Sequence, residues 1–131
     1  MSDSSMIIDT DCGVDDAIAI MMALGSDRYS VAGITTLSGN VPVAQVTENV
    51  LRLLSYLGRG DVPVFVGASG PCVGEARSAA GIHGVNGLGG IELPTTEKSA
   101  EKMSGPDAIF ELVSEHPGST LVTLGPLTNL A

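Results

Sequence analysis

The sequence predicts an α/β fold: a doubly wound, mainly parallel sheet with helices on both faces. Short β-branched apolar runs alternate with longer segments of helical spacing along the chain. The short runs are almost continuously apolar, as in strands that are buried on both faces. Strands joined through helices are expected to lie parallel, with right-handed crossovers.

Four short apolar runs bounded by polar or glycine residues are the expected strands. They span residues 6–9, 31–37, 62–66 and 119–124. The glycine-rich segment 67–96 has little periodicity and is expected to be a long loop. A loop of that length inside a compact domain is often functional.

Three segments are expected to be helices. Residues 15–24 are apolar almost all round, which predicts a buried helix that ends at Gly25. The segment after Pro42 is the clearest amphipathic pattern, and Gly105 opens a third helix through residue 114. A further helix begins at Pro126, so the chain stops within the pattern and we expect it to be incomplete at its C-terminus.

Composition excludes several classes of function. The 131 residues fit one domain, and 6 basic against 15 acidic residues give a net charge of −9. That charge argues against binding nucleic acid or an anionic membrane surface. Two cysteines, Cys12 and Cys72, provide neither a disulfide framework nor a zinc motif. Without a signal peptide or a long apolar run, the expected setting is cytoplasmic.

An acidic cluster follows the first expected strand and comprises Asp9, Asp11, Asp15 and Asp16. Carboxylates this close repel one another unless something positive lies among them. A hard divalent cation with oxygen ligands is the simplest partner. The alternative is an acidic helix start favoured by the helix dipole, but four carboxylates exceed what capping needs.

Polar or glycine residues also follow the other expected strands, at Asn40, Gly67 and Leu124. In open α/β sheets ligands bind beyond the carboxyl ends of the strands, so these segments are expected to meet at one site. Asn40 is either a site residue or part of an ordinary turn, since a Gly-Asn pair is common in turns. His83 on the glycine-rich loop is either a substrate contact or a plain surface histidine.

The motifs now resemble those of a known family, the inosine-uridine preferring nucleoside hydrolases. The resemblance lies in Asp9-Thr10-Asp11-Cys12-Gly13-Val14-Asp15-Asp16, Thr35-Thr36-Leu37-Ser38-Gly39-Asn40, His83-Gly84-Val85-Asn86-Gly87-Leu88-Gly89 and Leu124-Gly125-Pro126-Leu127-Thr128-Asn129, in that order. It implies that residues 1–131 are the N-terminal part of a single nucleoside hydrolase domain.

The resemblance implies calcium-dependent hydrolysis of the N-glycosidic bond of ribonucleosides. Mapped by motif, Asp11 and Asp16 ligate Ca²⁺ together with the backbone carbonyl of Leu124, and Asp11 is also the general base. Asp15 holds a ribose hydroxyl and Asn40 orients the water or sugar.

The remaining assignments are a substrate contact for His83 and a supporting role for Asp9. A homo-oligomer, either a dimer or a tetramer, is also expected. Cys12 stands where the family usually has proline, and Asn86 where aspartate is common. The base-binding residues, the leaving-group acid and a further calcium ligand are expected beyond residue 131.

Two other classes of function remain open from the sequence. One is a non-catalytic metal-binding or interaction module that keeps the cation site. The other is a phosphatase with an aspartyl nucleophile, since Asp-x-Asp after a first strand also occurs there. The phosphatase reading has no downstream lysine at a convincing position.

Overall fold

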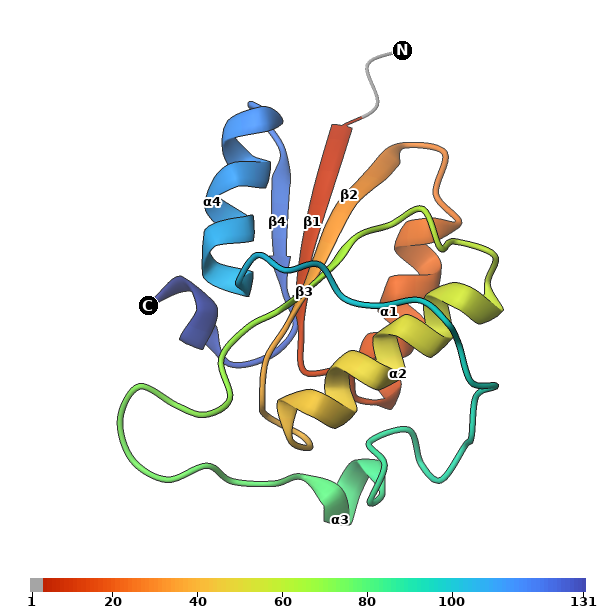
Figure 1. Ribbon diagram of the computed structural model, residues 1–131, viewed down its shortest axis with the longest axis vertical. Coiled ribbons are helices and arrows are strands. Elements are labelled where there is room, and N and C mark those ends of the chain that lie inside the picture. The colour runs from red at the N-terminus through yellow and green to blue at the C-terminus, as the bar shows by residue number, and fades with distance from the viewer. Residues whose placement is uncertain (1–3) are drawn as a thin grey trace.

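A parallel sheet forms the centre of the computed structural model, which describes residues 4–131 (Figure 1). Its strands are β1 (Ser4–Thr10), β2 (Tyr29–Thr36), β3 (Val64–Val66) and β4 (Thr120–Thr123). They lie in the order β3-β2-β1-β4, and each neighbouring pair is parallel. The predicted parallel sheet is confirmed, and β1 lies inside it with a partner on either side.

Helices cover both faces of the sheet, as predicted. They are α1 (Val14–Leu24), α2 (Val43–Tyr56) and α4 (Gly105–Glu115), with the short α3 (Ala80–His83) and the 3₁₀ helix η1 (Leu127–Leu130). In Figure 1, α1 and α2 lie on one side of the sheet and α4 on the other. Ser104 caps α4 by accepting a hydrogen bond from the Asp107 backbone N–H.

Alternating side chains of the strands build two separate cores, because successive residues of a strand point to opposite faces. Ile8, Ile34 and Val64 belong to the core cluster that includes residues of α1 and α2. Their neighbours Ile7 and Phe65 belong to a smaller cluster with Ala108 and Leu112 of α4. The near-continuous apolar character of the strands follows from burial on both faces.

Two helix starts differ slightly from expectation. Pro42 and Pro126 are N-cap residues rather than first helical residues, and both have an extended ψ. The segment after Pro126 is a single 3₁₀ turn that ends at Leu130, not an α-helix.

The prediction that α1 is buried on all sides is wrong for the residues that the structure describes. Only Asp16, Ala17 and Ile20 are buried, whereas the Met22 side chain is 72% exposed. One face of α1 packs on the sheet, mainly over β2, and the described residues leave the rest uncovered. An apolar pattern predicts that a helix avoids water but does not say which neighbours cover it.

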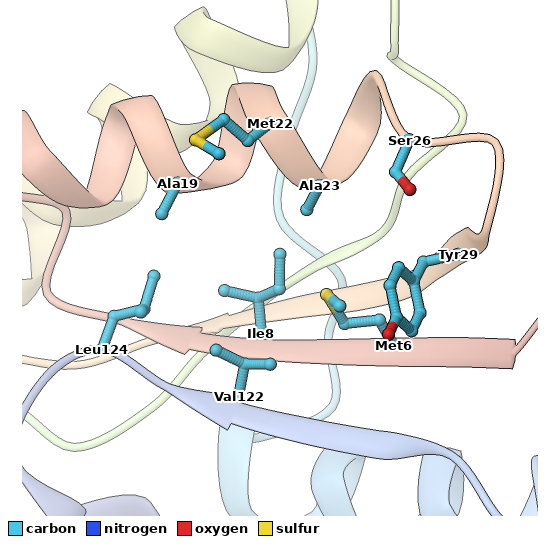
Figure 2. Close-up of a pocket in the computed structure, with 9 residues that line it drawn as sticks. All are labelled: Met6, Ile8, Ala19, Met22, Ala23, Ser26, Tyr29, Val122 and Leu124. Atoms are coloured by element: carbon cyan, nitrogen blue, oxygen red, sulfur yellow. The ribbon is translucent and has the colours of Figure 1, made fainter.

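An apolar groove of about 310 Å³ runs between α1 and the strands β1 and β4 (Figure 2). Its walls are mostly aliphatic side chains from those three elements, with Ser26 and Tyr29 at one end. The lining residues are Met6, Ile8, Ala19, Met22, Ala23, Ser26, Tyr29, Val122 and Leu124. The groove exists because α1 lies over β2 and leaves the β4 side of this face open.

The long segment between β3 and α4 crosses the carboxyl edge of the sheet, and α3 lies within it (Figure 1). It is tied to the strand ends by backbone hydrogen bonds, from Ser38 N–H to Ala68 O at 2.8 Å and from Ala79 N–H to Asn40 O at 3.0 Å. Apart from α3 it is irregular, as predicted for residues 67–96. Across residues 4–131, every helix is too short or too polar to cross a membrane.

Replacing Leu112 by alanine should lower the free energy of unfolding by about 2–4 kcal/mol, because it leaves a cavity between α4 and the sheet. Phe110→Ala on the same helix is the matched control, since that side chain is 72% exposed. It should cost less than about 1 kcal/mol. Urea unfolding measures both, and equal losses would contradict the packing of α4 described above.

Candidate functional site

The carboxyl end of β1 and the start of α1 place four aspartates around one turn. Asp9, Asp11 and Asp16 are buried, with at most 7% of each residue exposed. Asp15 differs, because its side chain is 81% exposed. Burial of three carboxyl groups at a strand end far exceeds what an acidic helix start requires, so the simple capping interpretation does not fit.

Thr10 fixes the turn that carries these groups. Its hydroxyl accepts a hydrogen bond from the Cys12 backbone N–H at 2.9 Å and donates one to Asp16 Oδ2 at 2.7 Å. Cys12 has φ 43°, a conformation that few residues other than glycine adopt. Such backbone strain is concentrated at functional sites, and here it brings Asp16 back toward the end of β1.

Asp11 lies where two chain connections come close to its carboxylate. Its Oδ2 accepts a hydrogen bond from the Asn40 backbone N–H at 3.1 Å. A Cβ at Gly39 would lie 2.8 Å from the Asp11 Cβ, and one at Gly125 would lie 3.1 Å from its Cγ. Any larger residue at Gly39 would therefore push on Asp11, whereas a larger residue at Gly125 would need only a small shift of Asp11.

Asp11 and Asp16 form a pair of adjoining buried carboxyl groups, and holding two negative charges there is unfavourable without a positive partner. Burial, and then the adjoining Asp11 carboxyl, raise the pKa of Asp16 to about 7, although the Thr10 hydrogen bond opposes this. Burial also raises the pKa of Asp9 above its usual range. A cation among these oxygens would replace the proton that the pair otherwise has to hold.

Asp9 is the most enclosed of the four, and it joins three chain segments. Its Oδ1 accepts hydrogen bonds from the Thr35 hydroxyl at 2.6 Å and from Asn129 Nδ2 at 2.8 Å. Its backbone carbonyl accepts the Leu124 N–H at 2.8 Å. Its Oδ2 is buried without a protein partner. Asp9 is thus linked to β2, η1 and the connection after β4, and its supporting role stays a prediction.

His83 and Asn40 lie beside Gly13 at the start of α1. The Val14 backbone N–H donates to His83 Nδ1 at 3.2 Å, so this ring nitrogen is an acceptor. The Asp15 carboxylate, 3.9 Å from the same nitrogen, is too far for a hydrogen bond. A Cβ at Gly13 would lie 2.7 Å from Asn40 Nδ2 and 2.8 Å from His83 Cε1, so these side chains are close neighbours.

The structure therefore divides the predicted residues into two neighbouring groups. Asp11 and Asp16 adjoin each other, and the Leu124–Gly125 backbone runs past Asp11. Asp15, Asn40 and His83 gather around the start of α1.

Sequence reasoning gave no role to three polar residues of the site: Thr10, Thr35 and Asn129. Thr10 and Thr35 could have been found from the sequence, because each is a polar residue near the end of an apolar strand.

The oxygen atoms of the site fit part of the coordination shell of a hard cation. Carboxylate and carbonyl oxygens are the ligands that Ca²⁺ takes in proteins. Within residues 4–131, however, no three His, Cys, Asp or Glu side chains are grouped to hold a metal ion. The described residues supply a carboxylate pair rather than a complete set of side-chain ligands.

Sequence and structure comparisons agree on the family. Residues 6–131 match the model of the family described as inosine-uridine preferring nucleoside hydrolase. The chain belongs to this family.

Among curated relatives, uridine nucleosidase 1 of Arabidopsis thaliana is 44% identical over 128 residues, which cover 96% of this chain and 38% of that protein. A pyrimidine-specific ribonucleoside hydrolase of Shewanella woodyi is 40% identical, covering 96% and 41%. The chain thus spans about two fifths of the length of these relatives.

Solved structures of nucleoside hydrolases share this fold. A plant nucleoside hydrolase superposes with a TM-score of 0.92 at 41% identity, covering 98% of this chain and 41% of that one. A purine-preferring ribonucleoside hydrolase from Gardnerella vaginalis gives 0.92 at 36% identity, covering 97% and 42%. The Rossmann-like nucleoside hydrolase fold predicted from the motifs is confirmed.

The raised pKa of Asp16 predicts that the metal-free protein loses stability as pH rises from about 4 to about 7. In this window the native carboxyl still binds a proton that the unfolded chain has released, so raising pH favours unfolding. Thermal unfolding in a chelating buffer measures the effect. Asp16→Asn should flatten the dependence, and a wild-type stability that rises across the window would contradict the shift.

Proposed function

We propose that the protein hydrolyses the N-glycosidic bond of ribonucleosides to ribose and free base, with Ca²⁺ as its cofactor. The observation that carries this proposal is the buried Asp11–Asp16 pair at the end of β1. Membership of the nucleoside hydrolase family supports the reaction class. Because relatives have names that specify uridine, pyrimidine or purine nucleosides, the proposal covers ribonucleosides as a class.

Asp11 and Asp16 would hold the cation, together with the Leu124 carbonyl. When bound, Ca²⁺ supplies a site for the sugar hydroxyls and the attacking water within a flexible shell of oxygens. A calcium ion is a weak acid compared with zinc, so a base that touches the water is still needed. We assign that role to Asp11, and the hydrogen bond that its Oδ2 accepts from the Asn40 N–H at 3.1 Å supports the assignment by orienting the carboxylate.

In the reaction, one water proton passes to Asp11 while the water oxygen bonds to the anomeric carbon of ribose. The bond from that carbon to the base nitrogen breaks, and the base leaves with the electron pair and takes up a proton. The sugar passes through an oxocarbenium-like transition state, whose positive charge the buried carboxylates stabilise. Direct displacement by water inverts the configuration of that carbon.

The second group of residues would orient the sugar. Asp15 is exposed and therefore free to accept a hydrogen bond from a ribose hydroxyl. Asn40 would orient the water or sugar from beside Gly13. In His83, Nδ1 is occupied by the Val14 N–H, which leaves Nε2 as the nitrogen available to a substrate.

Two further expectations belong to this proposal. Apolar side chains left exposed on α1, including Ile18 and Met22, support assembly into a dimer or tetramer. A cytoplasmic location, which the sequence led us to expect, is part of the same proposal.

Asp11→Asn should lower kcat by about 10²–10⁴-fold, because the amide cannot accept the proton of the attacking water. The assay measures kcat as ribose release from uridine and inosine. It uses a protein that spans the full length of the relatives. Asp107→Asn, a carboxylate-to-amide change at the capped start of α4, is the matched control and should leave kcat unchanged.

An Asp11→Asn variant with wild-type activity would overturn the role of Asp11. Calcium binding by the wild-type protein without ribose release would instead favour the non-catalytic module. Magnesium-dependent phosphate release would favour the phosphatase.

A further inference from the structure

Asn129 is a buried polar residue that the mechanism above does not use. It lies in η1 and is 4% exposed. Its Nδ2 donates to Asp9 Oδ1 at 2.8 Å and to the Thr36 carbonyl at 3.0 Å, and its Oδ1 accepts the Ala68 N–H at 2.8 Å. One amide group therefore joins β1, β2 and the start of the long segment after β3.

Two glycines form the space that holds this amide. A Cβ at Gly67 would collide with both Asn129 Oδ1 and Nδ2, and a Cβ at Gly105 would lie 3.4 Å from Nδ2 and 2.8 Å from Gly67 Cα. The backbone after β3 thus lies too close to Asn129 for a side chain at Gly67, and the first turn of α4 packs directly against Gly67. All the polar atoms of its side chain are satisfied, so its orientation is fixed.

The same side chain fixes the backbone that runs past Asp11. At one end of this connection, the Leu124 N–H donates to the Asp9 carbonyl at 2.8 Å. At the other end, Asn129 holds η1 against the strand ends. Gly125 lies between the two anchors, with its Cβ position 3.1 Å from Asp11 Cγ. The distance between Leu124 and Asp11 therefore depends on both anchors.

We propose that Asn129 is a positioning residue for the cation site, holding the Leu124–Gly125 backbone beside Asp11 so that both can bind one cation. The inference rests on the proposed function, because it takes Leu124 and Asp11 as joint ligands. A purely structural role would make Asn129 an anchor for η1 with no influence on the cation. The two roles differ in what they predict for metal affinity.

The test measures Ca²⁺ affinity by calorimetry. It uses metal-stripped protein that spans the full length of the relatives. Asn129→Ala should weaken binding by about tenfold or more, as for other residues that orient metal ligands. Asn129→Asp keeps the volume and the acceptor for Ala68 but loses both donations, so it should weaken binding as well. The second variant serves if the first does not fold.

Asn49→Ala is the matched control, because Asn49 is also 4% exposed and its Nδ2 also donates to a backbone carbonyl, that of Asn86. It should lower the melting temperature but change Ca²⁺ affinity less than twofold. Thr35→Val removes the other donor to Asp9 Oδ1 and leaves Asn129 in place. It should weaken binding less than Asn129→Ala does, because the connection after β4 keeps its anchor.

Wild-type affinity in a folded Asn129 variant would overturn the inference. So would equal weakening by Thr35→Val, since the effect would then act through Asp9 rather than through the connection after β4. Failure of the proposed function is distinguishable, because the wild-type protein would then either bind no Ca²⁺ in the same titration or bind it without releasing ribose.

Discussion

The burial of three carboxyl groups at the end of one central strand is the constraint on which this structure depends. Asp9, Asp11 and Asp16 leave water almost completely, which is costly for charged groups without partners. Hydroxyl and amide donors offset part of that cost at Asp9 and Asp16. The remaining imbalance, seen in the raised pKa of Asp16, is what makes the place suited to a cation.

The surrounding fold is arranged to meet this constraint. Because β1 lies between β2 and β4, donors can reach its carboxyl end from both sides, as Thr35 and Asn129 do. Close approach then requires backbone without a side chain at Gly39, and the absence of a side chain at Gly125 eases the approach from the other side of Asp11. Substitutions at these glycines would therefore disturb the chemistry of the site before they disturb the packing of the cores.

Local sequence pattern was enough to predict the helices, the strands and the acidic cluster. It was not enough to predict the contacts that join them. The strands and the helix after Pro42 follow from apolar spacing, and the cluster of four aspartates from charge crowding. Asn129 contacts Asp9 across a separation of 120 residues, and no local pattern encodes such a pair. The exposure of α1 was missed for a related reason, since spacing reveals hydrophobicity but not which segments supply the cover.

Cys12 shows how a thiol can lie within the acidic turn without joining its chemistry. Its thiol is fully buried in the core cluster below the turn, and burial followed by the nearby carboxylates raises its pKa to about 12. A protonated thiol is a poor nucleophile and a poor ligand for soft metals such as zinc or copper. The buried thiol is therefore protected from oxidants, and the groups at this turn that could meet a cation are its oxygens, although sulfur is next to Asp11 in sequence.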